Sequence, residues 1–457
     1  MAVLRPQTTE SSTNEGAARV VVSVSLTCYR CDRSSNHSNR TRCECGEPLW
    51  FEPAAPPSEA GIDHSGSDTT GLTESSMWRY AESLPIDSPS GLGRAVGGTP
   101  LLRCDGLAPE VDARLYVKDE PQNPTGSYKD RGSAVAVPHA IETSNDQSTT
   151  TSNDQSTTTS GDGSETIEAI GTVSYGNMAM STAAHAASLG VECVVLVPAD
   201  IPPERLAAID QYGPTIVRVD GDYGALYADA LDFSERLPVQ FLLSDAPSRL
   251  SGYSTIVYEV AEQLAPEMAD AIVIPASSGG FASGIWRGLC DLEAAGGMSS
   301  VPRLYVVQPA VSDPITRAFD AGLSTVDPLT PDEREETIAR SVGNPAPPSG
   351  TRTLAAVRAT GGAAVSVSES AIERAQIRFA RRGGFCVEPA AALPLAGLDR
   401  LEARGEIDAD DRIVLIPTGT GFKEIGTSAG TATGEPADGP PIVSRSSLTE
   451  ALENILA

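Results

Sequence analysis

A lysine in a turn of small residues is the strongest candidate for covalent chemistry in this chain. Lys129 lies in the segment 123–132 (NPTGSYKDRG), and the only other lysines are Lys118 and Lys423. Arginine can replace lysine at most surface positions, but it cannot act as a neutral amine that attacks a carbonyl. The retention of Lys129 therefore indicates imine chemistry, whereas Lys118 and Lys423 could be surface or ion-pair lysines.

Three more segments carry small or amide side chains where strand-like runs end. They are 174–177 (SYGN), 277–284 (SSGGFASG) and 417–423 (PTGTGFK). Glycine and serine let a ligand approach the backbone closely, and the N-terminus of a following helix favours a phosphate group. A glycine-rich turn is often only a turn, so each segment alone is a weak indication of a site.

Four cysteines near the N-terminus have the spacing of a metal site. Cys28 and Cys31 are separated from Cys43 and Cys45 by eleven residues. Two pairs of thiolates on tight turns supply the tetrahedral sulfur ligands that Zn²⁺ prefers, and so small a module has little core to fold without metal. We expect a structural zinc ribbon outside the catalytic core, with His37 a loop residue. Reduced cysteines without metal are the alternative.

The candidate segments would be positioned by strands and helices that alternate from about residue 113 onward. Short β-branched runs followed by alanine-rich runs are typical of parallel sheets covered by helices on both faces. Ligands in such sheets bind at the carboxyl ends of the strands, where the candidate segments lie. The predicted strands are Leu115–Val117, Ile167–Val173, Cys193–Val197, Ile216–Val219, Ala271–Ile274, Leu304–Val307 and Ile413–Ile416, and the predicted helices are Met178–Leu189, Gly252–Leu264, Gly284–Glu293 and Ala371–Arg381, the last with a capping box of Ser370 and Glu373.

In this order, the four segments make the chain resemble the fold-type-II pyridoxal-phosphate enzymes, and most closely the threonine synthase family. The resemblance covers roughly residues 77–425 and includes 76–80 (SMWRY), 97–101 (GGTPL), 117–120 (VKDE) and 342–345 (VGNP). It implies an α/β fold with two doubly wound domains and parallel sheets, preceded by a ribbon similar to the cysteine module. It also implies a lyase that uses pyridoxal 5'-phosphate in threonine biosynthesis.

The resemblance gives each segment a role. Lys129 would hold the cofactor as an imine and later transfer protons, and Asn177 would hydrogen-bond the hydroxyl of the cofactor ring. Thr418 would contact the pyridine nitrogen, where a neutral hydroxyl suits elimination and replacement at the β and γ carbons. The loop of Ser277, Ser278, Gly279, Gly280 and Phe281 would bind the cofactor phosphate, and Ser127, Ser174 and Arg249 would contact substrate.

The reaction that the resemblance implies is conversion of O-phospho-L-homoserine and water to L-threonine and phosphate. The sequence departs from the family pattern at Met178, where a threonine that contacts substrate phosphate is usual, and at Ser244-Asp245, where Asn-Ser is usual. These changes remove donors from a site for a dianion. A serine/threonine dehydratase, a β-replacement enzyme similar to cysteate synthase and a non-catalytic regulatory paralogue stay open as alternatives.

Composition shifts along the chain predict its modules. Residues 143–150 (TSNDQSTT) are repeated at 151–158, so 143–164 should be a polar, disordered insert without chemical function. The predicted units are a tail and ribbon at 1–52, a linker at 53–76, a large cofactor-binding domain at 77–127 and 253–430, a small α/β domain at 128–252 and a C-terminal tail at 431–457.

The chain is strongly acidic. Its 457 residues carry 61 Asp+Glu against 33 Lys+Arg, which gives a formal net charge of −28. This charge disfavours nucleic acid and anionic membranes as partners. The family resemblance implies a small amino-acid substrate. Residues 1–19 are polar and no apolar run approaches the roughly 20 residues of a membrane span, so we expect a cytoplasmic protein. Because family members are commonly dimers, the resemblance allows a homodimer.

The acidic, lysine-poor composition predicts adaptation to molar salt, as in a haloarchaeal cytoplasm. At about 1 M salt the screening length falls to roughly 3 Å, so closely spaced carboxylates repel one another less. We predict that circular dichroism will show loss of the folded spectrum when the protein is moved from molar KCl to dilute buffer. A complete native spectrum in dilute buffer would refute the halophilic interpretation.

Overall fold

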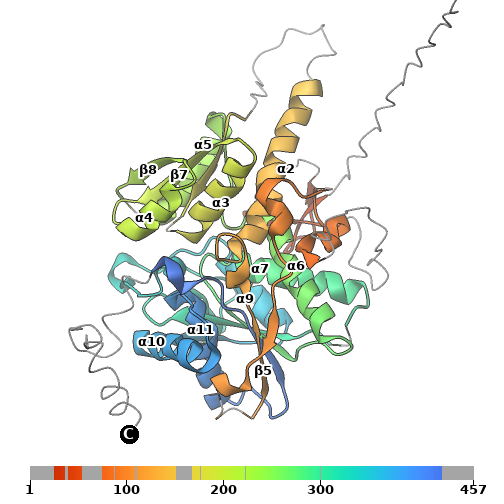
Figure 1. Cartoon of the computed structure of the whole chain (residues 1–457), viewed down its shortest axis with the longest axis vertical. Helices are drawn as coiled ribbons and strands as arrows, with labels where there is room; N and C mark the ends of the chain where they lie inside the picture. Colours follow the sequence, from red (N-terminus) through yellow and green to blue (C-terminus); the bar gives the residue numbers. More distant parts are fainter. Residues whose placement is uncertain are drawn as a thin grey trace, which may run out of the picture.

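Two sheets of mainly parallel strands, each covered by helices, form the body of the structure (Figure 1). The computed structural model describes residues 25–35, 40–53, 75–150 and 167–424, apart from positions 87, 109, 111, 175, 222 and 299. His37, most of the predicted linker, the second half of the predicted insert and the C-terminal tail lie outside the described residues. None of the helices within these ranges is both long and apolar enough to cross a membrane.

The larger sheet has six strands in the order β12-β11-β10-β13-β5-β4. All neighbouring strands are parallel except β4, which pairs antiparallel with β5. The central strand β10 is buried along its whole length, as expected for a parallel strand covered on both faces. The strands are β4 Leu101–Arg103, β5 Arg114–Lys118, β10 Ala271–Pro275, β11 Arg303–Pro309, β12 Ala364–Val367 and β13 Arg412–Leu415.

Alternate residues of this sheet pack into separate cores on its two faces. On β10, Val273 joins the core that includes helices α10 and α11, whereas Ile272 and Ile274 join the core that includes α6 and α7. This division follows from the two-residue period of a strand. The helices of this unit are α6 Pro247–Leu264, α7 Gly280–Ala294, α8 Pro314–Asp320, α9 Gly350–Ala359, α10 Glu369–Arg378 and α11 Pro389–Ala403.

The smaller sheet has four parallel strands in the order β8-β7-β6-β9. Helices α2 and α3 pack with Ile170 and Val195 on one face, and α5 packs with Val173 and Leu196 on the other. The elements are β6 Ala169–Val173, β7 Glu192–Pro198, β8 Thr215–Val219, β9 Val239–Phe241, α2 Lys129–Thr150, α3 Asn177–Ser188, α4 Pro203–Asp210 and α5 Tyr223–Arg236.

These sheets confirm the predicted α/β class with parallel strands. Every predicted strand and helix is present with shifted ends, and the short strands β4, β9 and β12 were missed. Helix α10 is capped by Ser368, whose hydroxyl accepts from the backbone of Ala371 at 3.3 Å, so the predicted cap at Ser370 was wrong. Helix α6 begins at Pro247 and packs on both α2 and α7, so it crosses the predicted domain boundary at residue 252.

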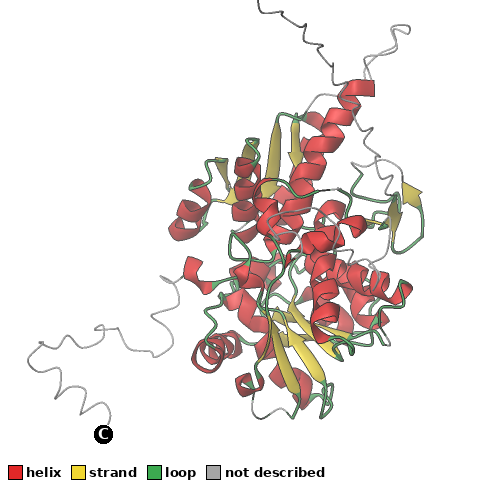
Figure 2. Cartoon of the chain, turned by 45° about the vertical axis from the view of Figure 1, so that its right-hand side comes forward, coloured by secondary structure: helices red, strands yellow, loops and turns green. Residues whose placement is uncertain are grey.

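The first copy of the polar repeat is helical, which corrects the predicted disorder of residues 143–150. Helix α2 runs through Thr150, and its far end projects beyond the smaller sheet (Figure 2). Within this end, Thr143 Oγ1 donates to the carbonyl of His139 at 2.9 Å. Elongation of a helix that has already formed costs far less than nucleation, so buried turns nearer the start of α2 extend into a polar segment.

The cysteine module forms a three-stranded antiparallel sheet in the order β2-β1-β3, with β1 Leu26–Cys28, β2 Ser34–Ser35 and β3 Leu49–Phe51. We call residues 25–35 and 40–53 the ribbon. It is packed against the body: strand β3 lies on α6, and the rings of Trp50 and Trp286 meet with centroids 5.3 Å apart. The ribbon is therefore packed on helices of the larger unit and is not an isolated module.

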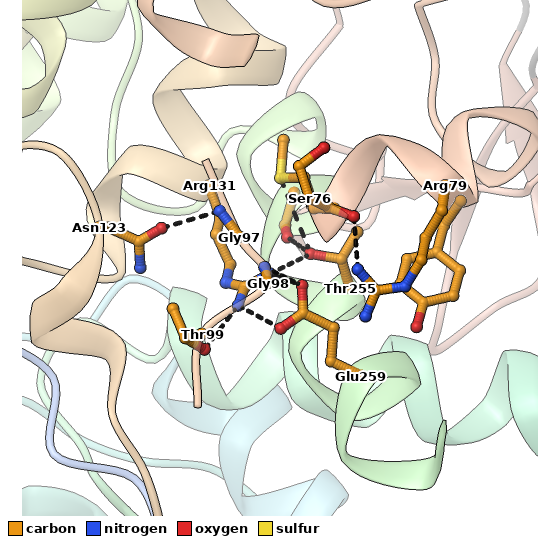
Figure 3. A network of polar contacts seen from close by, with 12 residues as sticks. Ser76, Arg79, Gly97, Gly98, Thr99, Asn123, Arg131, Thr255 and Glu259 are labelled. Atoms are coloured by element: carbon orange, nitrogen blue, oxygen red, sulfur yellow. Dashed lines mark hydrogen bonds and ion pairs between the residues drawn. The ribbon is translucent and has the colours of Figure 1, made fainter. Parts of the chain in front are cut away.

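Arg131, two residues after Lys129, is the centre of a buried charge network. Figure 3 shows the side of this network that contains Glu259 and Thr99. Its guanidinium donates to both oxygens of Glu120 at 2.7 and 2.8 Å and to both oxygens of Glu259 at 2.8 Å. All three side chains are completely buried. Removal of one partner would leave a charge in the interior without compensation, so the three groups hold their elements together.

Glu259 also gathers neighbouring segments around Arg131. It accepts from Lys118 Nζ at 2.6 Å and from the backbone N–H of Gly98 at 2.7 Å. Burial alone would raise the pKa of Glu259, but Arg131 and Lys118 more than offset it and the pKa is lowered. Strand β5, helix α6 and the loop at Gly98 are thereby fixed to the first turn of α2, which begins with Lys129.

We predict that Arg131→Met lowers the free energy of unfolding by about 3–5 kcal/mol, because two buried carboxylates lose their shared cation. Denaturant titration in molar KCl measures the loss. The control is Arg236→Met, since Arg236 forms an ion pair with Asp232 in which both side chains are more than half exposed, and its loss should cost less than about 1 kcal/mol. Equal losses in the two variants would contradict a special role for the buried network.

Candidate active site

Lys129 is the first residue of α2, and its amine lies near two aromatic rings and forms no ion pair with the described residues. Its Nζ is 4.7 Å from the ring centroid of Tyr128 and 5.8 Å from that of Tyr253. Burial lowers the pKa of Lys129 to about 7, the charge of Arg249 adds to this effect, and Glu388 opposes it. The amine is therefore partly neutral, and hence nucleophilic, near neutral pH.

A cavity with about 820 Å³ of empty space, including its open mouth, surrounds Lys129. It is where the four candidate segments meet, since each contributes residues to its wall. Their contacts with a cofactor stay a prediction, but the structure does bring them together. The predicted residues that line the cavity are Lys129, Ser174, Asn177, Ser277, Ser278, Gly279, Gly280, Phe281 and Thr418.

The glycine-rich loop ends at the start of α7 and packs closely against the backbone of neighbouring segments. Gly279 has φ +88°, and an added Cβ would lie 2.4 Å from the carbonyl oxygen of Ser349. A Cβ on Gly280 would lie 2.2 Å from the carbonyl oxygen of Ser244. Only glycine fits at either position, and the free N–H groups of a helix N-terminus favour phosphate. The loop therefore fits the phosphate of pyridoxal phosphate.

Asn177 does not cap helix α3, because the cap position is Gly176. Its amide is instead held from both sides: Nδ2 donates to Glu388 at 2.7 Å, and Oδ1 accepts from Lys423 Nζ at 2.6 Å. Glu388 also lines the cavity and was missed from the sequence. The signal that could have found it is an acidic residue directly before Pro389, which begins helix α11.

Thr418 is buried at the cavity wall and contacts the turn that directly precedes Lys129. Its carbonyl accepts from the backbone N–H of Tyr128 at 3.1 Å. The adjoining Gly419 pairs with Ser127 in a short antiparallel bridge. The position of Thr418 relative to Lys129 is thus fixed by backbone contacts. This suits the predicted role of Thr418, which is to contact the pyridine ring of a cofactor bound to Lys129.

Of the residues that depart from the family pattern, two line the cavity and one does not. Met178 and Ser244 line the cavity, and the buried Ser244 Oγ has no hydrogen-bond partner among the described residues, so it remains free for a ligand. Asp245 does not line the cavity. It pairs with Arg42 at 2.8 Å and accepts from Ser349 Oγ at 2.8 Å. Its charge is therefore compensated and does not repel an anion in the cavity.

Two predicted substrate residues, Ser127 and Arg249, are fully buried and do not line the cavity. Arg249 lies in the first turns of α6 and donates to Ser133 Oγ at 2.8 Å and to Thr182 Oγ1 at 2.7 Å. Its guanidinium thus joins α6 to α2 and α3. In this arrangement Arg249 acts on the site through its charge, which helps to lower the pKa of Lys129.

The segment around residues 340–344 supplies cavity residues that the sequence analysis did not assign. Arg340, Ser341 and Asn344 line the wall, and Asn344 Nδ2 donates to Ser278 Oγ at 2.8 Å. Arg340 is exposed at the cavity, and no carboxylate of the described residues pairs with it. The motif VGNP at 342–345 was the available signal, but it did not point to the arginine before it.

The sulfur atoms of the ribbon cysteines lie close enough to share one ion. Cys28 and Cys45 are 3.6 Å apart, Cys31 and Cys43 are 3.6 Å apart, and all four ligand atoms lie within 4.8 Å of one another. Tetrahedral zinc with bonds of about 2.3 Å would place its sulfurs roughly 3.8 Å apart. The residues present therefore fit zinc, which stays a prediction.

The two sheets, the lysine with its lowered pKa and the glycine-rich loop at a helix N-terminus are the features of a pyridoxal-phosphate enzyme. The chain belongs to the pyridoxal-phosphate dependent enzyme family, whose sequence profile matches residues 92–419. It is 35% identical to threonine synthase of Methanocaldococcus jannaschii over 77% of this chain and 81% of the relative. It is 34% identical to threonine synthase of Methanosarcina acetivorans over 76% of this chain and 80% of the relative.

Solved structures with the same fold include enzymes with other reactions. O-ureido-L-serine synthase matches with a TM-score of 0.58 and 19% identity, over 79% of this chain and 98% of the other. A fungal L-serine ammonia-lyase from Rhizomucor miehei matches with a TM-score of 0.57 and 22% identity, over 70% and 93%. The fold is therefore established by these likenesses, and the reaction must be argued from the site.

We predict that the amine of Lys129 in cofactor-free protein titrates with a midpoint near pH 7, because burial lowers its pKa to about 7. The neutral amine predominates above this pH, so trace acetylation of Lys129 should rise as pH increases through 7. Peptide mass spectrometry measures it, and Lys118, which is completely buried, is the internal control. A midpoint near that of an ordinary lysine, about pH 10.4, would contradict the prediction.

Proposed function

We propose that the protein is a threonine synthase that converts O-phospho-L-homoserine and water to L-threonine and phosphate. The observation that carries this proposal is that one cavity holds two separate groups suited to phosphate. The loop at the start of α7 suits the cofactor phosphate, and Arg340 on the same wall supplies a cation with which no carboxylate of the described residues pairs. The identity with two archaeal threonine synthases supports the same reaction.

Different residues of the cavity have different roles in this reaction. Bound pyridoxal phosphate supplies an electron-withdrawing ring that acidifies the carbon next to the substrate amine. Lys129, with a pKa of about 7, accepts and returns protons at the α and β carbons. Asn177, fixed by Glu388 and Lys423, orients the ring, and Arg340 stabilises the phosphate as it leaves the γ carbon.

A dehydratase or a β-replacement enzyme is the second candidate, and Met178 favours it. Its thioether lies on the cavity wall and cannot donate a hydrogen bond to phosphate. A smaller substrate without a phosphate would suit that part of the wall. A non-catalytic role is disfavoured by the retained Lys129 with its lowered pKa.

The test is incubation of cofactor-loaded protein with O-phospho-L-homoserine in molar KCl, with phosphate and threonine measured together. We expect both products in equal amounts. Keto-acid release from serine or threonine, without turnover of the phosphate ester, would overturn the proposal and favour the dehydratase.

We predict that Arg340→Gln raises the KM for O-phospho-L-homoserine by roughly tenfold or more, since a charge-assisted hydrogen bond is worth about 1.5–3 kcal/mol. Affinity for pyridoxal phosphate should be unchanged. Arg400→Gln is the matched control, because Arg400 is an exposed arginine of α11 that does not line the cavity. An unchanged KM in Arg340→Gln would remove Arg340 from the substrate site.

A further inference from the structure

One charged side chain of the ribbon reaches the wall of the catalytic body. Arg42, directly before Cys43, donates from Nη2 to Asp245 Oδ2 at 2.8 Å and from Nη1 to the carbonyl of Pro348 at 3.3 Å. The side chain of Asp245 is only 5% exposed. Burial would raise the pKa of Asp245, but Arg42 and Arg352 lower it, so the carboxylate stays charged and depends on these cations.

A second arginine, Arg352 of α9, belongs to the body and reaches the backbone of the ribbon. It is completely buried, and its Nη1 donates to the carbonyls of Pro48 and Leu49 in the ribbon, at 3.2 Å each. On the other side its Nε donates to Ser283 Oγ at 2.8 Å, and its Nη2 donates to Ser349 Oγ at 3.1 Å. Arg352 therefore joins the ribbon backbone to helix α7.

Both connections end on the loop that suits the cofactor phosphate. Ser349 Oγ donates to Asp245 at 2.8 Å, while the backbone N–H of Ser349 donates to the carbonyl of Ser278 at 2.9 Å. Ser283 Oγ donates to the carbonyl of Gly279 at 2.7 Å. Arg352 is thus two hydrogen bonds away from the backbone of residues 278–279, and Arg42 is three away through Asp245 and Ser349.

The ribbon contacts come from a single turn that carries two of the cysteines. Arg42 and Pro48 pair across this turn, and Cys43 and Cys45 lie within it. The backbone N–H of Cys43 donates to the carbonyl of Glu47 at 2.8 Å. A metal held by these cysteines would fix the turn, and with it the guanidinium of Arg42 and the carbonyl of Pro48.

We propose that the ribbon is a positioning element of the active site. Through Arg42 and Arg352, it holds the loop at residues 277–281 in the geometry that binds the cofactor phosphate. Metal binding in the ribbon and pyridoxal-phosphate binding in the cavity are therefore coupled. Coupling between binding sites is reciprocal, so cofactor also tightens metal binding. This role goes beyond the proposed reaction, and it holds for any amino-acid substrate of the site.

The first test is Arg42→Gln in the full chain, with three measurements: metal content, the dissociation constant for pyridoxal phosphate, and the thermal midpoint. We expect weaker cofactor binding by roughly fivefold or more, with metal content retained. Arg33→Gln is the control, because Arg33 pairs with Glu44 inside the ribbon and both side chains are more than 60% exposed. Unchanged cofactor affinity in Arg42→Gln would overturn the proposal.

A double-mutant cycle with Asp245→Asn distinguishes an effect of Arg42 on the position of the cofactor loop from a general loss of protein stability. If Arg42 acts through Asp245, the Arg42→Gln/Asp245→Asn pair should weaken cofactor binding no more than the worse single variant. Additive losses would overturn this route.

Chelation of the ribbon metal tests the coupling without a substitution. We expect cofactor affinity to fall on chelation and to return when zinc is restored. Cofactor binding that is indifferent to metal, in a protein that stays folded by circular dichroism, would overturn the proposal. The readout is cofactor binding, so a failure of the threonine synthase assignment would not alter either outcome.

Discussion

The structure depends first on the compensation of charge around Arg131. One guanidinium bonds both oxygens of Glu120 and of Glu259, and Lys118 completes the balance at Glu259. None of these groups touches solvent, so each keeps its charge only while the others stay in place. This network fixes the first turn of α2 and therefore the direction of the neighbouring Lys129. The lowered pKa of Lys129 depends on its surroundings, so it is kept only while the neighbouring elements stay in place.

The two sheet units meet near Lys129, and each supplies other residues of the cavity wall. The smaller unit supplies Asn177 and Met178 from the start of α3, and the larger unit supplies the glycine loop and Thr418. All lie where parallel strands end and helices begin, so free N–H groups and short side chains converge on one cavity. The amide of Asn177 bridges the units through Glu388, 211 residues further along the chain.

The residues that depart from the family pattern can be explained by the groups that surround them in the structure. Asp245 would weaken an anion site if it faced the cavity, but it faces Arg42 and Ser349 instead. A residue that looked unfavourable for phosphate is thus the anchor of the ribbon. Met178 does remove a donor from the wall, and Arg340 provides a cation on the same wall.

The sequence by itself determined the fold class and the segments that line the cavity, Lys129 among them, because these depend on local spacing: runs of β-branched residues, glycines in tight turns and a retained lysine. Only the tertiary structure decided which buried charges meet. It made Lys118 an ion-pair lysine, moved Arg249 out of the cavity lining, and revealed Glu388 and Arg340. The physical reason is that the partner of a buried charge lies far away in sequence, as Arg42 and Asp245 do at 203 residues, and no local pattern encodes that pairing.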